Sequence, residues 1–305
     1  MIRIYLLTGF LGAGKTTLLQ SLLESFKDHK IGVVVNEFGE VNVDARLVKR
    51  DGIEMAELSN GSVFCACIKD KFVESLIEMS AMGLEYLFIE ASGLADPSNM
   101  GQILDGIRHK TADRYEPAGT ICVIDALNFI DLVDLLPALA RQVEYASAVI
   151  VNKADLASGL QIAEVSDRIR GMNPGAPVYI TSYCRTDVLE IIENLSNQAK
   201  ESAETTNTYG SRPSAFVLKA AGQIPYAGLE SFLRHIAPGS YRIKGFAETE
   251  IGNVEISSVM SDIHLNKWPS EIAGTEIVVI SSIGIRMLSS IVAASNAHLE
   301  GRLSL

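Results

Sequence analysis

The feature that most constrains this chain is a glycine-rich segment near its start. Gly9–Thr17 reads Gly-Phe-Leu-Gly-Ala-Gly-Lys-Thr-Thr and directly follows the apolar run Arg3–Thr8. It fits the pattern G-x-x-x-x-G-K-[ST], and leucines at helical spacing come next. Such a loop lets consecutive backbone N–H groups turn toward phosphate oxygens at the positive end of a helix. We therefore expect a nucleoside triphosphate to bind through Gly12, Ala13, Gly14, Lys15, Thr16 and Thr17.

Two side chains of this segment carry most of the expected chemistry. Lys15 would bring one ammonium to the outer phosphates and neutralise charge during their transfer, which makes it a candidate catalytic residue. Thr16 would place its hydroxyl on Mg²⁺, a hard cation that takes oxygen ligands. The sequence therefore predicts a magnesium–nucleotide site where a first strand meets a first helix.

A second motif indicates which base is bound. The apolar run Ala148–Val151 ends in Asn152-Lys153-Ala154-Asp155, an N-K-x-D at the carboxyl end of an expected strand, where ligands of open α/β sheets bind. The Asp155 carboxylate can accept both the ring N–H and the exocyclic amine of guanine, whereas adenine offers no such pair. Asn152 and Lys153 would hold the loop and cover the base, and Ser182 would add a backbone contact. We expect GTP and GDP as ligands.

Two further segments are candidates for sensing the third phosphate. Glu90 ends an expected strand and precedes Gly93; the carboxylate can hold Mg²⁺ or orient the attacking water, and the Gly93 N–H can bond the γ-phosphate. The segment Asn36–Glu40 is a second switch candidate, with Glu37 as a catalytic residue near the metal or the water and Asp44 downstream. The alternative for Glu37 and Asp44 is an acidic, solvated loop.

The order of the expected elements predicts an α/β protein. Short β-rich runs alternate with helical patterns as far as about residue 190, which is typical of βαβ units and a mostly parallel sheet. The expected strands are Arg3–Thr8, Ile31–Val35, Tyr86–Glu90, Gly119–Asp125, Ala148–Asn152 and Val178–Thr181. The expected helices are Lys15–Lys27, Lys71–Met82, Met100–His109, Pro137–Ser147, Ile162–Met172 and Asp187–Ser202.

A polar stretch divides the chain into two parts. Residues 199–213 contain almost no large apolar side chain, which is typical of a solvated linker. We therefore expect a P-loop domain over residues 1–198 and a small α+β domain over residues 214–305. In the second domain the expected strands are Ser214–Lys219, Gly239–Phe246 and Glu276–Ser282, and the expected helices are Gly228–His235 and Gly284–Leu299.

Composition limits the classes of partner. The 305 residues carry 26 Lys and Arg against 37 Asp and Glu, hence a formal charge of −11, which disfavours nucleic acid and anionic membranes. Four cysteines form no disulfide framework, and no run reaches the ~20 apolar residues needed to cross a bilayer. We expect a cytoplasmic protein that binds neither nucleic acid nor membrane.

Taken together, the motifs resemble those of the CobW-like GTPases, relatives of the HypB and UreG accessory GTPases. The resemblance rests on Gly9–Thr17, Asn36–Glu40, Glu90–Pro97 and Asn152–Asp155, and Tyr241–Phe246 is similar to a strand motif of a CobW-type C-terminal domain. It implies a P-loop domain followed by that C-terminal domain. It also implies a GTP-hydrolysing metallochaperone or insertase whose nucleotide state controls metal affinity or contact with a client metalloenzyme.

The metal motif of that family is altered in this chain. The family has Cys-x-Cys-Cys directly after Asn-Gly, whereas here Asn60-Gly61 is followed by Ser-Val-Phe, Cys65, Ala and Cys67. Two thiolates one residue apart can bind Zn²⁺ or another transition metal, but Zn²⁺ normally takes four ligands. The others would have to come from Glu37, Glu40 or His109. The alternatives are a half-buried pair of free thiols, or a redox pair, although a disulfide at this spacing is strained.

Other cysteines and histidines give no clear functional signal. Cys122 and Cys184 are expected to be packing residues. The C-terminal histidines His235, His264 and His298 are scattered along the sequence, and each is expected to be structural.

The motifs also predict slow hydrolysis. No glutamine stands two residues after Gly93 and no arginine finger is evident in cis, so a client protein or a homodimer contact would complete the site. The position of Glu37 and Cys65 in one inter-strand segment would let nucleotide state reposition a metal-binding loop. The alternative function is a GTP-regulated chaperone of a cofactor-dependent enzyme, for example a corrinoid enzyme, whose own cysteines bind no metal. An ATP-using kinase is disfavoured by Asp155.

Overall fold

The computed structural model describes residues 1–36, 53–58, 69–195 and 214–304. The described residues form two compact units, one ending at residue 195 and the other beginning at residue 214. The expected linker, residues 199–213, lies outside the described residues, as do the switch segment after Asn36 and the segment with Cys65 and Cys67. Each unit is considered separately below.

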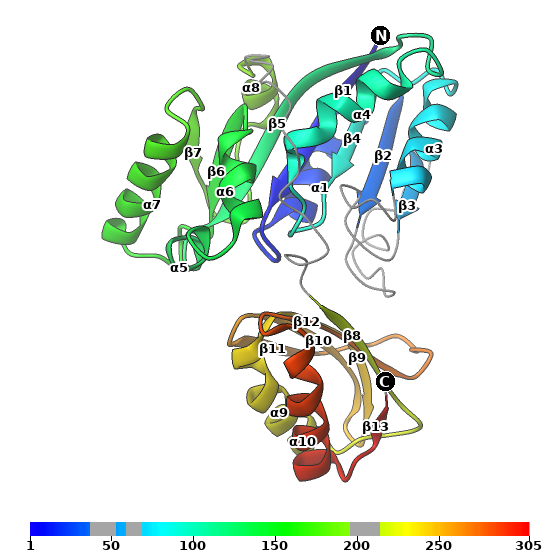
Figure 1. Ribbon diagram of the computed structural model, residues 1–305, viewed down its shortest axis with the longest axis vertical. Helices are drawn as coiled ribbons and strands as arrows, with labels where there is room; N and C mark the ends of the chain where they lie inside the picture. Colours follow the sequence, from blue (N-terminus) through cyan, green and yellow to red (C-terminus); the bar gives the residue numbers. More distant parts are fainter. Residues whose placement is uncertain (37–52, 59–68, 196–213, 305) are drawn as a thin grey trace. The chain divides into compact units, whose positions relative to one another are not determined.

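The first unit is built on a parallel sheet with the strand order β3-β2-β4-β1-β5-β6-β7 (Figure 1). Because the strands run parallel, their carboxyl ends share one edge, and β1 lies between β4 and β5. This arrangement confirms the predicted α/β class. The strands are β1 (Ile2–Gly9), β2 (Ile31–Asn36), β3 (Ile53–Leu58), β4 (Tyr86–Glu90), β5 (Tyr115–Asp125), β6 (Ala148–Asn152) and β7 (Val178–Ile180).

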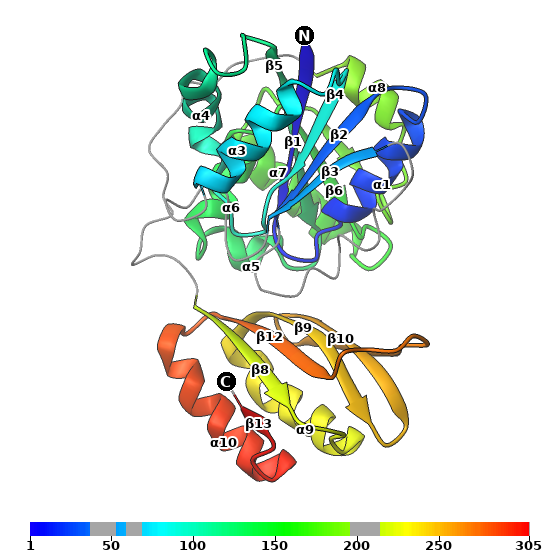
Figure 2. The ribbon, with the colours of Figure 1, turned by 90° about the vertical axis from the view of Figure 1, so that its right-hand side faces the viewer.

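Helices cover both faces of this sheet, as apolar parallel strands require. On one face, α1 and α8 pack on side chains such as Leu7 and Val123, and on the other α3 and α4 pack on side chains such as Leu6 and Ile89 (Figure 2). The helices are α1 (Lys15–Ser25), α3 (Lys69–Ser80), η1 (Pro97–Asn99), α4 (Met100–Ile107), α5 (Phe129–Val133), α6 (Pro137–Glu144), α7 (Gly159–Met172) and α8 (Val188–Glu193).

The second unit is an antiparallel sheet in the order β11-β10-β9-β12-β8-β13, with α9 and α10 packed on one apolar face. The expected strand motif Tyr241–Phe246 lies within β9. The elements are β8 (Ala215–Ala220), α9 (Tyr226–Ile236), η2 (Ala237–Gly239), β9 (Ser240–Thr249), β10 (Gly252–Val259), β11 (Asp262–Lys267), β12 (Thr275–Ser281), η3 (Gly284–Arg286), α10 (Met287–Leu299) and β13 (Leu303–Ser304).

Several elements were not predicted from the sequence. They are β3, η1, α5, η2, the hairpin of β10 and β11, and β13. In β11 the side chains alternate between exposed and half-buried positions, so the strand carries little of the apolar signal that marks a core strand. Strand β5 begins at Tyr115 rather than Gly119, and its register to β1 shifts between Pro117 and Gly119. Pro has no N–H to donate to the ladder, which is why a proline in a strand commonly accompanies such a bulge.

None of the described helices combines the length and the apolar composition needed to cross a bilayer.

Candidate nucleotide-binding site

The glycine-rich loop connects the end of β1 to the first residue of α1. Gly14 caps the helix in a left-handed conformation, with φ +116°, and Lys15 is the first helical residue. A Cβ on Gly14 would lie 2.4 Å from the side-chain nitrogen of Asn152, so a larger residue has no room there. Gly12 and Ala13 lie in the loop, and Thr17 is an exposed residue in the first turn of α1. The backbone N–H groups at this helix start form an arrangement that accepts phosphate.

Lys15 and Thr16 are the first two residues of α1, directly after the loop. The Lys15 side chain is 6% exposed and its Nζ donates to the carbonyls of Gly9, at 2.9 Å, and Phe10, at 3.1 Å. The Thr16 hydroxyl donates to Oε1 of Glu90 at 2.9 Å. Glu90 is the last residue of β4 and is only 3% exposed. The structure therefore brings the two residues predicted to hold Mg²⁺ into direct contact, and both offer oxygen ligands.

The loop after β4 lies against the glycine-rich loop. A Cβ on Gly93 would lie 2.5 Å from the backbone nitrogen of Leu11. The buried side chain of Gln142, from α6, donates to the carbonyls of Gly93, at 3.3 Å, and Ala95, at 2.8 Å. Gln142 thus holds the segment in which Gly93 is the candidate phosphate sensor. This role was not predicted from the sequence, because a glutamine in a helix gives no local signal of it.

Asn152 connects the two sequence motifs. Its side chain is buried at the end of β6, and its Nδ2 donates to the carbonyl of Ala13 at 2.8 Å. Its Oδ1 accepts the backbone N–H of Cys184 at 2.9 Å. The Cys184 side chain also contacts this junction, since its Sγ lies 3.4 Å from the carbonyl of Gly14. Burial raises the pKa of the Cys184 thiol to about 12. Cys184 is therefore more than the packing residue expected from the sequence, because it lies between the two loops.

The other residues of the second motif lie beside Asn152. Lys153 has a left-handed backbone with φ +61°, which is uncommon for a residue with a side chain. The side chain of Asp155 is exposed, and its backbone N–H donates to the hydroxyl of Ser182 at 3.0 Å. Ser182 therefore contacts the motif itself. The Asp155 carboxylate is therefore open to solvent, at the same sheet edge as the phosphate loop.

Asp125 is a candidate site residue that was not predicted from the sequence. It ends β5, is 4% exposed, and its Oδ2 accepts from Lys153 Nζ at 2.8 Å and from Asn128 Nδ2 at 2.9 Å. Its Oδ1 accepts the backbone N–H of Leu127 at 3.0 Å. Asp125 thus holds the lysine of the N-K-x-D motif in place. The signal that could have found it is an acidic residue directly after the buried apolar run Ile121–Ile124.

The expected metal ligands are only partly described. Glu37, Glu40, Asp44, Cys65 and Cys67 lie outside the described residues. Of the residues named as further ligands, His109 alone is described. It follows α4 and precedes β5, whose first residue, Tyr115, is paired with Ile2 at the amino end of β1. His109 therefore lies at the sheet edge opposite to Glu90 and the phosphate loop.

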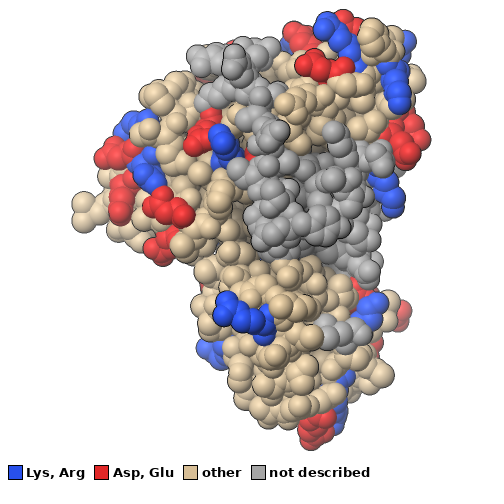
Figure 3. Space-filling model, viewed as in Figure 1, with Lys and Arg blue, Asp and Glu red and all other residues tan. Residues whose placement is uncertain are grey.

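Side chains of both charge signs are interspersed on the visible face of the first unit (Figure 3).

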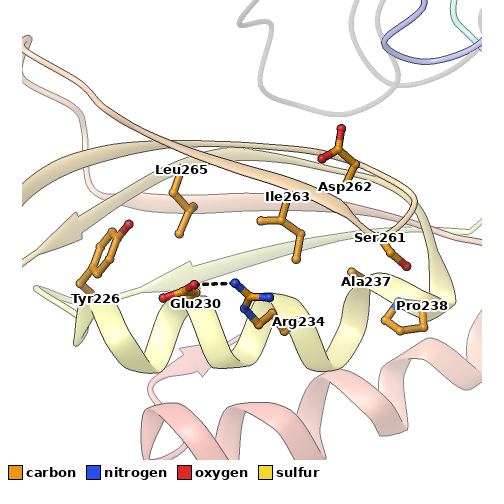
Figure 4. Close-up of a pocket in the computed structure, with 9 residues that line it drawn as sticks. All are labelled: Tyr226, Glu230, Arg234, Ala237, Pro238, Ser261, Asp262, Ile263 and Leu265. Carbon is orange, nitrogen blue, oxygen red and sulfur yellow. Dashed lines mark hydrogen bonds and ion pairs between the residues drawn. The ribbon is translucent and has the colours of Figure 1, made fainter. Parts of the chain in front are cut away.

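A separate cavity lies in the second unit. This cavity, of about 600 Å³, is lined by α9, η2, the loop after β10 and β11, and Ile263 and Leu265 point toward α9 (Figure 4). Its polar lining includes the ion pair of Glu230 and Arg234, at 2.8 Å. It shares no residue with the candidate nucleotide site.

Comparisons with known proteins agree with this geometry. The CobW/HypB/UreG nucleotide-binding domain matches residues 3–180. The chain is 33% identical over 193 residues to the zinc chaperone YjiA of Escherichia coli K12, covering 61% of this chain and 59% of that protein. It is 27% identical over 240 residues to the zinc-regulated GTPase metalloprotein activator 1 of Dictyostelium discoideum, covering 66% and 50%. The matches therefore span about half to three fifths of these relatives.

The fold has a counterpart among solved structures. The crystal structure of Zn(II)-bound YjiA GTPase from E. coli superposes with a TM-score of 0.50 and 23% identity, covering 97% of this chain and 98% of that one. This likeness concerns the fold alone. The family match covers more than half of the chain and contains the phosphate loop, Glu90 and the N-K-x-D motif. The chain belongs to the CobW/HypB/UreG family of nucleotide-binding proteins.

Proposed function

We propose that this chain binds GTP and hydrolyses it slowly, and that its nucleotide state controls the delivery of a metal or metal cofactor to a client protein. The names of the relatives support this proposal, since they include zinc chaperones and a zinc-regulated GTPase metalloprotein activator. A cytoplasmic location is part of the proposal. The geometry of the first unit supports the nucleotide part most directly.

One observation carries the proposal: the Asn152–Ala13 hydrogen bond joins the base-recognition motif to the phosphate loop. A nucleotide has a base at one end and phosphates at the other, so a site for it needs two subsites at a defined separation. The carboxyl ends of β1 and β6 supply these subsites at one sheet edge, where ligands of open α/β sheets bind. The hydrogen bond from the buried Asn152 amide to the Ala13 carbonyl sets the distance between these two subsites.

The exposed carboxylate of Asp155 supports guanine over adenine. Guanine presents a ring N–H and an amine side by side, and a carboxylate can accept both. Adenine would leave one carboxylate oxygen facing an unprotonated ring nitrogen, which costs binding energy. The Ser182 hydroxyl accepts a hydrogen bond from the backbone N–H of Asp155 and so holds this loop in place.

Thr16 and Glu90 fit a magnesium ion. Hydroxyl and carboxylate oxygens suit this hard cation, which would neutralise charge on the phosphates when bound. Lys15 would add its own positive charge at the outer phosphates, and Gly93 would offer its backbone N–H to the γ-phosphate. These groups would position the nucleotide and neutralise the charge of its phosphates. We therefore expect a low intrinsic rate of GTP hydrolysis, which contact with a client protein or a second copy of the chain raises.

The metal part of the proposal rests on Cys65 and Cys67 together with the relatives. Two thiolates favour borderline and soft ions such as Zn²⁺. Elemental analysis of the purified chain, before and after Cys65→Ser with Cys67→Ser, tests this part. Stoichiometric metal that disappears in the variant supports it. Absence of metal from both proteins favours the alternative function, a GTP-regulated chaperone of a cofactor-dependent enzyme.

Calorimetry with GTP, GDP and ATP in the presence of Mg²⁺ tests the nucleotide part. We expect heat with both guanine nucleotides and none with ATP. Asp155→Asn should weaken GDP binding and favour xanthosine diphosphate, whose C2 carbonyl can accept from the new amide. Asp167→Asn is the matched control, since Asp167 is an exposed aspartate on α7, with its side chain 76% exposed. No heat with GTP or GDP in the parent protein would refute the proposal.

A further inference from the structure

The second unit contains two helices that pack closely over their length. Gly228, near the start of α9, lies against the end of α10: a Cβ on it would be 2.4 Å from the carbonyl oxygen of His298. Gly239, just after α9, lies against Met287, the first residue of α10. The two helices are therefore antiparallel, and Gly228 allows their backbones to approach.

This packing brings together two of the histidines that are scattered in the sequence. In a helix, each Cα–Cβ bond tilts toward the N-terminus. In an antiparallel pair, the C-terminal end of each helix lies beside the N-terminal end of the other. Side chains in the last turns of the two helices therefore lean along the pair toward each other. His235 lies in the last turn of α9 and His298 in the last turn of α10. Their ring centroids are 5.6 Å apart and the ring planes are inclined at 65°.

This separation suits two imidazoles that share a metal ion. Zn–N bonds are about 2.0–2.1 Å long, so the ring centers of two histidines bound at a tetrahedral angle lie about 5.2 Å apart. The observed 5.6 Å differs from this by an amount that small side-chain rotations remove. We propose that His235 and His298 form a binding site for a divalent transition-metal ion on the second unit, separate from the nucleotide site and from Cys65 and Cys67.

The surroundings of the pair are compatible with a cation. Arg234 precedes His235, but its guanidinium pairs with Glu230 on the side of α9 that faces β11, whereas α10 lies on the other side of α9 (Figure 4). Its positive charge is thereby directed away from the two imidazoles. His235 is exposed and His298 is half-buried, so an ion can reach both from solvent.

The chemistry of the pair defines the kind of site. Among the described residues, no group of three or more His, Cys, Asp or Glu side chains is placed to hold a metal. Two imidazoles therefore leave the other coordination positions to water, and such a site loads and releases its ion readily. Imidazole nitrogen suits Zn²⁺, Ni²⁺ and Cu²⁺, with Cu²⁺ bound most tightly.

The test is a zinc titration of the full chain without nucleotide, in competition with a chromogenic chelator. All proteins carry Cys65→Ser and Cys67→Ser, which removes the two candidate thiolate ligands. We expect His235→Gln and His298→Gln each to weaken Zn²⁺ binding by about tenfold or more, since either removes one of two protein ligands. The double variant should bind little more weakly than either single variant, because the ion is shared.

His264→Gln is the matched control. His264 is a third histidine of the same unit, is exposed, and pairs with Asp262 at 3.0 Å on β11. Zinc affinity in this variant should equal that of the parent. Electron paramagnetic resonance of bound Cu²⁺ provides a second readout: the parent should show coupling to two imidazole nitrogens and each single variant to one. Equal zinc affinity in the parent and the double variant, or an equal loss in His264→Gln, would overturn the proposal whatever the outcome with GTP.

Discussion

The side-chain amide of Asn152 donates to the carbonyl of Ala13 at 2.8 Å, across 139 residues of sequence. Its oxygen accepts from the backbone of Cys184 at 2.9 Å. One buried side chain therefore joins three loops at the carboxyl edge of the sheet. The subsites proposed for the phosphates and for the base depend on each other through this residue.

Replacement of Asn152 should uncouple these loops. Asn152→Ala leaves the Ala13 carbonyl and the Cys184 N–H without this partner, which costs about 1–3 kcal/mol for each buried group. We expect GDP affinity, measured by calorimetry, to fall by at least tenfold.

Asn173→Ala is the matched control for this variant. Asn173 is equally buried and donates to the carbonyls of Val143 and Ala146, but it precedes β7 and so lies at the opposite sheet edge. This variant should lose thermal stability and keep its GDP affinity. A similar loss of affinity in both variants would show that general destabilisation is responsible.

Asp125 should act through Lys153. Asp125→Asn removes a charge-assisted hydrogen bond worth about 1.5–3 kcal/mol from a buried position, so guanine nucleotides should bind more weakly. Lys153→Ala should have a similar effect, and the double variant should fall short of the sum. Asp134→Asn provides the comparison, since Asp134 pairs with Arg168 on the surface and such pairs contribute little. Additive losses for Asp125 and Lys153 would exclude the proposed positioning role.

The close approach of Gly93 to Leu11 predicts a steric effect. Gly93→Ala would place a methyl group 2.5 Å from the Leu11 backbone nitrogen, so the phosphate loop must shift and GTP affinity should fall. Gly106→Ala, in α4, meets nothing within 4 Å. It should leave binding unchanged and raise stability by about 0.5–1 kcal/mol, as expected for alanine in a helix. Thermal melts and calorimetry on both variants measure these effects, and unchanged GTP affinity in Gly93→Ala would contradict the prediction.

Thr16 should determine the magnesium dependence of nucleotide binding. Thr16→Val keeps the side-chain shape but removes the hydroxyl that contacts Glu90, whereas Thr16→Ser retains a hydroxyl. In the valine variant, we expect the GDP affinity measured with Mg²⁺ to be no higher than the affinity measured with EDTA. In the serine variant, the GDP affinity measured with Mg²⁺ should stay close to that of the parent protein. A valine variant that still responds to Mg²⁺ would place the ion elsewhere.

The buried thiols predict a loss of stability at alkaline pH. Burial raises the pKa of Cys122 and of Cys184 to about 12, against about 8.5 for a thiol in an unfolded chain. Between these values the folded state retains protons that the unfolded state has released. Stability should therefore fall as pH rises from about 8.5 toward 12, by about 1.4 kcal/mol per pH unit for each thiol.

Cys122→Ala tests this effect away from the loops. The variant loses packing at every pH, but its stability should decline less steeply above pH 8.5 than that of the parent. Urea unfolding at pH 8 and at pH 10 provides the comparison. Parallel declines in the two proteins would show that the thiol does not titrate as proposed.

Much of the first unit could be predicted because its signals are local. The six strands expected in this unit are present, since a mostly apolar run between helical segments is typical of a parallel strand. The hairpin of β10 and β11 was missed because its residues are half polar, and β3 because it reads Ile-Glu-Met-Ala-Glu-Leu, with two acidic residues. Such strands form by pairing with a neighbour, which a single segment does not reveal.

The sequence by itself determined the α/β class, the phosphate loop and the N-K-x-D motif, because each depends on residue types at fixed spacing along one segment. Only the tertiary structure decided that Asp125 holds Lys153, that His109 lies at the opposite sheet edge, and that His235 meets His298. These relationships depend on strand order and on the antiparallel packing of helices. Both are set by burial of apolar faces among elements far apart in the chain, so no local spacing records them.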